Sequence, residues 1–158
     1  MTDFLTTYRL TRQRFDDLVR SFPEQHFHHR IVAETLTMAE MAMHVAGVEI
    51  YVITSLLVRE TNEWEKRMIG CAFNGVVNNN PFPFSESEMT RESMLNALDE
   101  ARKLTESVMS SGDDSIRRRE IKSVLGPMID GDGAMARLCA HPFYHQGQGY
   151  LILQLVAG

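Results

Sequence analysis

The sequence predicts an all-α protein in which four amphipathic helices form one bundle across residues 1–158. Apolar side chains recur three and four positions apart over four long segments, which is the spacing of one helix face. No run of alternating apolar and polar residues is long enough to predict a sheet. A chain of 158 residues has the usual size of one domain and can bury roughly 70% of its unfolded surface in one core. One helical domain is therefore expected, with a long crossover between its second and third helices.

The first two helices are predicted in the N-terminal half. The first ends at Pro23, and its stripe in four-three spacing consists of Phe4, Tyr8, Thr11, Phe15, Leu18 and Phe22. After the loop PEQHFHHRIV, a second helix is expected from Glu34 to Glu65. One face of this second helix contains Met41, His44, Val48, Tyr51 and Ser55. His44 is therefore expected to point into the core.

The third helix follows a long connection, residues 71–84 (CAFNGVVNNNPFPF), whose asparagines and prolines end any regular element. Ser85 and Glu88 then have the spacing of a capping box. The third helix is expected from Ser87 to Ser111, and Gly112 is its natural C-terminal stop.

The C-terminal part of the chain predicts a short helical segment and the fourth long helix. The short segment is amphipathic, runs from about Ser115 to Leu125 and ends at Gly126-Pro127. The last helix follows DGDG, residues 130–133. Its inward stripe consists of Ala134, Leu138, His141, His145, Gln148, Ile152 and Leu155. Two histidines are thus expected on a buried face.

Composition narrows the class of protein. The net charge of −5, from 16 basic and 21 acidic residues, gives no basic stripe for nucleic acid, and the cluster Arg117–Arg119 with Lys122 is interpreted as a solvated helix surface. Cys71 and Cys139 are too few for a disulfide framework, and the start MTDFLTTYRL has no charged-then-apolar leader. The longest apolar run, residues 42–58, falls short of the roughly 20 residues of a membrane span. We therefore expect a cytoplasmic protein that binds neither nucleic acid nor membrane.

The inward histidines predict a metal site. His141 and His145 are four residues apart on one helix, so their β-carbons lie roughly 5–6 Å apart and both imidazoles can reach one ion. Alone, such a pair is more typical of core or partly exposed histidines satisfied by hydrogen bonds. His44 points inward from another helix, and one divalent ion would satisfy three imidazoles that are costly to bury. Three histidine ligands leave coordination positions open, as in catalytic sites, and they suit zinc, nickel, iron(II) or manganese.

Other polar residues near these positions have two interpretations each. The loop histidines have no helical spacing and are interpreted as surface residues; they are His26, His28 and His29. Cys139 is about 200° round the helix from His141 and is expected to be packing. Glu40 either orients a ligand or bound water one turn before His44 or is a surface glutamate. Gln148 either has a polar role in the cavity or satisfies a neighbouring helix.

Two strings carry a resemblance to a known family. MAMHVAGVE (41–49) and, about a hundred residues later, HPFYHQGQ (141–148) resemble the signature of the DinB/YfiT-like superfamily of metalloenzymes. The resemblance implies a four-helix bundle in up-down-down-up order, with His44, His141 and His145 as metal ligands. Two departures concern the last helix: Gln146 stands where the family often has Arg, and Pro142 between the two ligands should bend the helix axis.

The resemblance also implies a function. Relatives include metal-dependent thiol S-transferases and isomerases that use a low-molecular-weight thiol, so we expect a transferase of this type with a small-molecule substrate. The alternatives are a non-catalytic metal-binding or regulatory module, forming a homodimer through its helix faces, and a metal-dependent hydrolase. Residues 71–84 are long enough to form a lid or substrate rim beside the site, or only the crossover.

Overall fold

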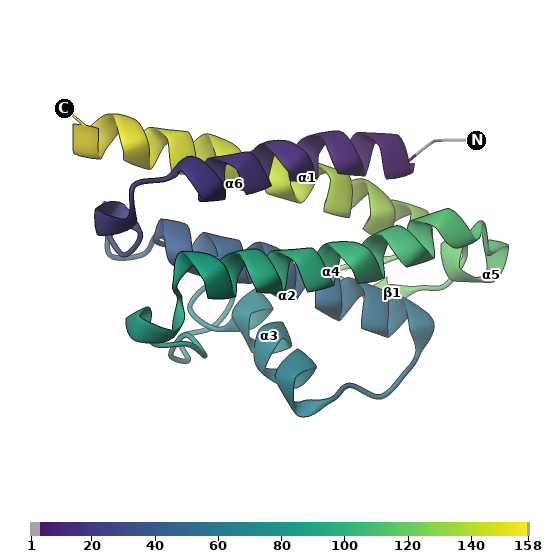
Figure 1. Ribbon diagram of the computed structural model, residues 1–158. Helices are drawn as coiled ribbons and strands as arrows, with labels where there is room; N and C mark the ends of the chain where they lie inside the picture. Colours follow the sequence, from purple (N-terminus) through teal and green to yellow (C-terminus); the bar gives the residue numbers. More distant parts are fainter. Residues whose placement is uncertain (1–3, 158) are drawn as a thin grey trace.

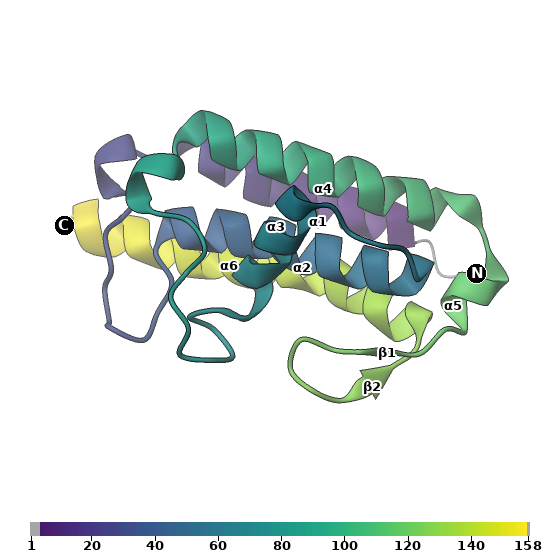
Figure 2. The same cartoon turned by 90° about the horizontal axis from the view of Figure 1, so that it is seen from below.

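Four long helices dominate the computed structural model, which describes residues 4–157. They are α1 (Phe4–Ser21), α2 (Met38–Leu57), α4 (Arg91–Ser111) and α6 (Gly131–Ala157). α1 packs against α6 and α4, and α2 packs against α4 and α6. The ribbon shows α1 and α6 running in one direction and α2 and α4 in the opposite one (Figures 1 and 2). The predicted all-α class is therefore confirmed, apart from one small hairpin.

The predicted second helix, Glu34 to Glu65, is wrong in both its ends and its continuity. α2 begins after Thr37, whose side chain forms a capping box with Glu40, and it ends at Leu57 before Val58 in the left-handed conformation (φ 50°). A separate helix, α3 (Glu63–Phe73), begins after Asn62. The Asn62 side chain accepts from the Glu65 N–H, and the Glu65 carboxylate accepts from the Asn62 N–H, so this second capping box starts a new helix. α3 packs beneath α2 (Figure 1).

The start of the predicted third helix is also wrong. Ser85 and Glu88 do form a capping box, but it starts only a 3₁₀ turn, η2 (Glu86–Glu88). α4 begins at Arg91, after Thr90, whose hydroxyl accepts from the Ser93 N–H. Its end at Ser111, with Gly112 left-handed (φ 64°), agrees with the prediction. The first loop likewise contains a 3₁₀ turn, η1 (Glu24–His26).

The predicted helical segment from Ser115 to Leu125 is helical only as far as Arg117 and then enters a β-hairpin. A four-residue helix, α5 (Asp114–Arg117), precedes two antiparallel strands, β1 (Ile121–Lys122) and β2 (Met128–Ile129). Gly126, at φ 110°, lies in the turn between them. Each strand has two residues, too few to show the alternation that predicts a sheet. The hairpin lies along one side of the bundle and reaches from the α5 end towards its middle (Figure 2).

The core sits around α2, which is buried along almost its whole length. By length and composition α2 is the one helix among residues 4–157 that could cross a membrane, although 83% of that stretch is buried inside the fold, as in the core helix of a globular protein. α6 continues as helix through Pro142. The two ligand candidates on either side of this proline therefore stay on one helix.

A buried ion network joins three of the long helices, and the sequence did not predict it. Arg12 of α1 is fully buried; its Nε donates to Glu49 of α2 (2.7 Å) and its Nη2 to the carbonyl of Leu98 of α4 (2.6 Å). Asp16, one turn further along α1, also pairs with Arg12. Burial alone would lower the pKa of Arg12, but the Glu49 carboxylate raises it above its ordinary value, so the guanidinium stays charged.

Candidate metal site

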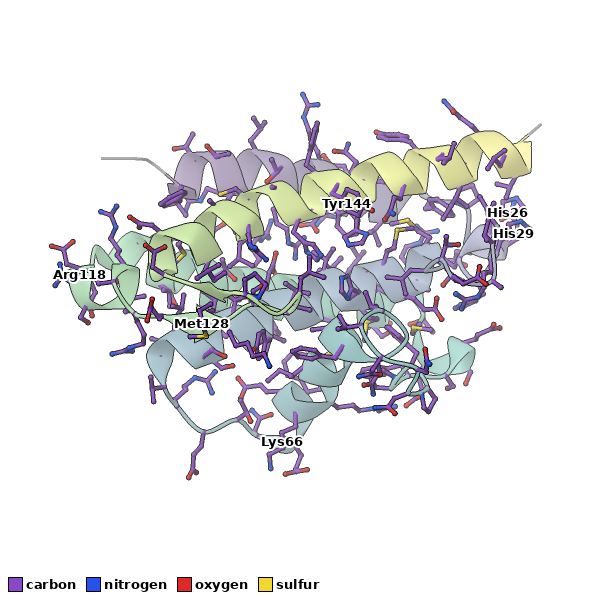
Figure 3. The ribbon with its side chains drawn as sticks, turned by 180° about the vertical axis from the view of Figure 1, so that it is seen from behind. His26, His29, Lys66, Arg118, Met128 and Tyr144 are labelled. Atoms are coloured by element: carbon purple, nitrogen blue, oxygen red, sulfur yellow. The ribbon has the colours of Figure 1, made fainter. Side chains whose placement is uncertain are left out.

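The structure brings the three predicted histidines together between α2 and α6. His44 lies in the N-terminal half of α2, and His141 and His145 lie one turn apart on α6. His44 and His145 are buried and His141 is half-buried. Tyr144, next to His145, marks the position of the site in the side-chain view (Figure 3). This group could hold a metal ion, since its three candidate ligand atoms lie within 4.8 Å of one another.

The Nε2 atoms converge on one point. His141 Nε2 lies 3.1 Å from His44 Nε2 and 3.0 Å from His145 Nε2. Nitrogen ligands bound tetrahedrally at 2.0–2.1 Å from zinc are separated by about 3.3 Å. The observed separations are close to that value, so only a small outward movement would be needed to admit an ion.

The second ring nitrogens of two histidines are hydrogen-bonded. His44 Nδ1 lies 2.8 Å from the carbonyl oxygen of Cys71, and His145 Nδ1 lies 2.7 Å from Oε1 of Gln148. Both partners are acceptors, so each Nδ1 is the protonated nitrogen that donates. The Gln148 amide is itself oriented by donating from Nε2 to the Tyr144 hydroxyl (3.1 Å). The lone pairs of His44 and His145 are thereby directed at the common point, as in histidine ligands of metals.

The Cys71 carbonyl is free to accept because it lies in the last turn of α3. The last four carbonyls of a helix have no partner within the helix. Gly47 of α2 lets α3 come this close, since a β-carbon there would lie 2.2 Å from the carbonyl oxygen of Met68. The end of α3 thus fixes the ring of His44, a role that the sequence did not reveal because α3 was not predicted as a helix.

Burial keeps the three imidazoles neutral. It lowers the pKa of His145 to about 3, with a further contribution from His44, and it lowers the pKa of His44, which the Cys71 carbonyl partly offsets. The pKa of His141 lies well below its ordinary value because of burial, the two other histidines and Arg12. Neutral imidazole is the form that binds metal.

Without an ion, the hydrogen bonding of the cluster is incomplete. Only His141 can place a proton between the three Nε2 atoms, because the protons of the other two are on Nδ1. The His141 Nδ1 is buried and has no hydrogen-bond partner among residues 4–157, so a proton on Nε2 would leave this lone pair unsatisfied. A cation bound by all three Nε2 atoms would satisfy the three lone pairs that meet there; His141 would then carry its proton on Nδ1, which has no partner among residues 4–157 in either form. The donor set therefore fits a divalent metal.

The site opens into a cavity of about 840 Å³ between α2, α6, the hairpin and the loop before α2. All three histidines line it, together with Gln148 and mostly apolar side chains. Gly75 and Val76, from the connection considered either as a lid or rim or as only the crossover, also belong to its lining. A small organic molecule would fit in this volume.

The other candidates lie outside the cluster. Glu40 does not orient His44: its carboxylate accepts from the Thr37 N–H (2.8 Å) and pairs with Arg30 (2.6 Å). Cys139 packs as expected, with its sulfur near the carbonyl of Phe4 (3.4 Å). The loop histidines are not part of the group; His26 and His29 lie far from Tyr144 in Figure 3. Of the two roles considered for Gln148, the polar role in the cavity is the one observed.

The sequence matches no model of a protein family, and no curated protein shows significant similarity to it.

Proposed function

We propose that the chain is a metal-dependent enzyme in which His44, His141 and His145 hold one divalent ion at the wall of the cavity. The observation that carries the proposal is the convergence of three Nε2 atoms while the Nδ1 atoms of His44 and His145 donate elsewhere. Three protein ligands leave room for a ligand from the cavity, as in catalytic rather than structural sites. The arrangement of the long helices is consistent with the up-down-down-up bundle implied by the DinB-like resemblance.

We further propose that the reaction is the transfer of a low-molecular-weight thiol to an electrophilic substrate. When bound, a divalent ion would lower the pKa of a coordinated thiol so that a thiolate exists near neutral pH. The protein's own thiols are poor nucleophiles, because burial raises the pKa of Cys71 to about 12 and of Cys139 to about 11. Neither cysteine lines the cavity. A nucleophilic thiolate would therefore have to come from a small molecule.

Metal analysis of protein purified without a histidine tag tests the site. We expect about one divalent ion per chain in the wild type and almost none in His145→Ala, because two imidazoles hold an ion much more weakly than three. His29→Ala is the matched control, since His29 is exposed and lies outside the cluster. Equal metal content in all three proteins would contradict the proposed site.

A conjugation assay tests the reaction. The metal-loaded protein is mixed with an electrophile and, in turn, several small thiols, with and without chelator. Turnover that needs both the ion and one particular thiol is the expected result. A metal-loaded protein that is inactive with every thiol, but hydrolyses activated esters, would instead favour the hydrolase alternative.

A further inference from the structure

The cavity has a cationic side chain at one end. Arg137 lines it and lies one turn before His141 on α6, so Arg137, His141 and His145 form one stripe along the helix. A step of four residues corresponds to about 6 Å along the axis. The Arg137 side chain therefore lines the same cavity as the candidate metal site, and its contact with Ser123 places the guanidinium on the side of the hairpin.

Arg137 has unused hydrogen-bonding capacity. Its Nη1 donates to the hydroxyl of Ser123, a buried residue between the two strands. The same hydroxyl accepts from the Leu125 N–H (3.2 Å), which fixes its position. Within residues 4–157, no carboxylate forms an ion pair with Arg137. Nearly the whole planar fork, which suits a carboxylate, remains available.

The opposite end of the cavity has the opposite charge. Besides the histidines, two described residues that line the cavity have charged side chains: Arg137 and Glu34. Glu34 lies in the loop just before α2. The first residue of α2, Met38, contacts α6 at Gly149, where an added β-carbon would lie 3.0 Å from the Met38 sulfur. Glu34 is therefore near the Gly149 end of the cavity. Gly149 is twelve residues from Arg137, about 18 Å along the helix. In Figure 3 Tyr144 lies between the hairpin, marked by Met128, and the loop end, marked by His26 and His29. A bound anion is therefore favoured at the Arg137 end.

The wall between these ends is apolar. Val48 and Val52 of α2 and Leu138 of α6 belong to one packed apolar cluster that lines the cavity, and Val124 and Ile129 line its hairpin end. The rim also has large apolar side chains that are exposed; they are Val32, Val76, Leu125, Tyr144 and Leu151. Burying this surface against an apolar ligand would be favourable at about 25 cal/mol per Å². The ligand should therefore have a sizeable hydrocarbon or aromatic part.

We propose that the cavity binds an organic carboxylate, with the carboxylate on the Arg137 fork and the apolar part against the apolar side chains that line the cavity and its rim. The inference rests on the proposed function in taking this ligand as the substrate of the same site. Arg137 is the one arginine or lysine among the described residues that line the cavity, and a single guanidinium suits a monoanion better than a phosphate dianion, whose sites usually gather several cationic side chains or a helix N-terminus. The carboxylate end would lie one helical turn from the histidines.

Calorimetric titration of the metal-loaded full chain with octanoate and with 1-octanol tests the proposal. These probes share the apolar chain and differ in charge. We expect Arg137→Gln to weaken octanoate binding about tenfold or more, because a hydrogen-bonded charge is lost, and to leave 1-octanol binding unchanged. Arg118→Gln is the control: it removes the same charge from an exposed arginine outside the cavity. Equal octanoate affinity in the wild type and Arg137→Gln, or no octanoate binding by the wild type, would overturn the proposal.

Repeating the titrations on chelated protein separates this inference from the metal site. Octanoate binding that persists without metal and still depends on Arg137 supports the carboxylate subsite, whatever the metal analysis shows. Octanoate binding that disappears on chelation and is unaffected by Arg137→Gln means that the carboxylate binds the ion itself. That result would overturn the inference and leave the proposed metal site intact.

Discussion

Single hydrogen bonds decide where the lone pairs of the histidines point. Gln148 lies three residues after His145 on α6, so the sequence alone places its amide near that ring, and the structure shows the contact. The corresponding partner of His44 is a backbone carbonyl from another helix, and such an acceptor has no signature in a sequence. The i, i+4 pair on α6 was therefore predictable, whereas the partner that orients His44 was not.

Replacing Gln148 by leucine should weaken metal binding by about 10- to 100-fold, the usual effect of losing the residue that orients a histidine ligand. The leucine keeps the bulk of the side chain but leaves the Nδ1–H of His145 without its acceptor. Competition with a chromophoric chelator measures the affinity. Gln154→Leu is the matched control, since Gln154 is an exposed glutamine of the same helix; an equal affinity for both variants would contradict the orienting role.

Among the helices, the close approach of α3 to α2 matters most for the geometry of the candidate metal site. Gly112 predicted the C-terminal end of α4, and apolar spacing predicted the single long α6. It failed between Val58 and Asn62, where a left-handed residue and a capping box divide one expected helix into two. The end of α3 then supplies the carbonyl for His44, so the same local break builds part of the site.

Gly47→Ala should destabilise the protein by about 1–3 kcal/mol, because the added methyl group would collide with the backbone of α3 at Met68. It should also weaken metal binding, since α3 can only yield by moving the Cys71 carbonyl away from His44. Urea denaturation and metal titration measure the two effects.

Gly147→Ala is the control for this substitution. It also adds a methyl group within a helix, but no atom lies within 4 Å of the new β-carbon. We expect it to stabilise the protein by about 0.5–1 kcal/mol, the usual gain of alanine over glycine in a helix. Similar destabilisation by both substitutions would show that the closeness of α3 is not the cause.

For the molecule as a whole, the site imposes a dependence of stability on pH. Three histidines with lowered pKa values stay neutral in the folded protein at pH values where they are protonated in the unfolded chain. The unfolded state therefore binds more protons, and the free energy of unfolding rises with pH across this window. For His145 the window extends from its folded pKa of about 3 up to its ordinary value near 6.5. Stability is lost as the pH falls below that ordinary value.

Chelated wild-type protein should accordingly lose stability more steeply than His145→Leu between pH 6 and 4. Each proton taken up on unfolding contributes about 1.4 kcal/mol per pH unit, so removing one such group should reduce the slope by up to that amount. Urea denaturation at several pH values measures both slopes, and His29→Leu serves as the exposed control. Parallel curves for wild type and His145→Leu would mean that His145 is not held neutral by the fold.

The buried Arg12 network has a consequence for how the helices align during folding. A displacement of α1 by one turn along its neighbours would carry the guanidinium about 6 Å away from Glu49 and the Leu98 carbonyl. Unlike a displaced leucine, which finds another apolar contact, an unpaired buried charge costs several kcal/mol. The network therefore favours the one register of α1 in which Arg12 meets both partners over near-native alignments that the apolar stripes alone would tolerate.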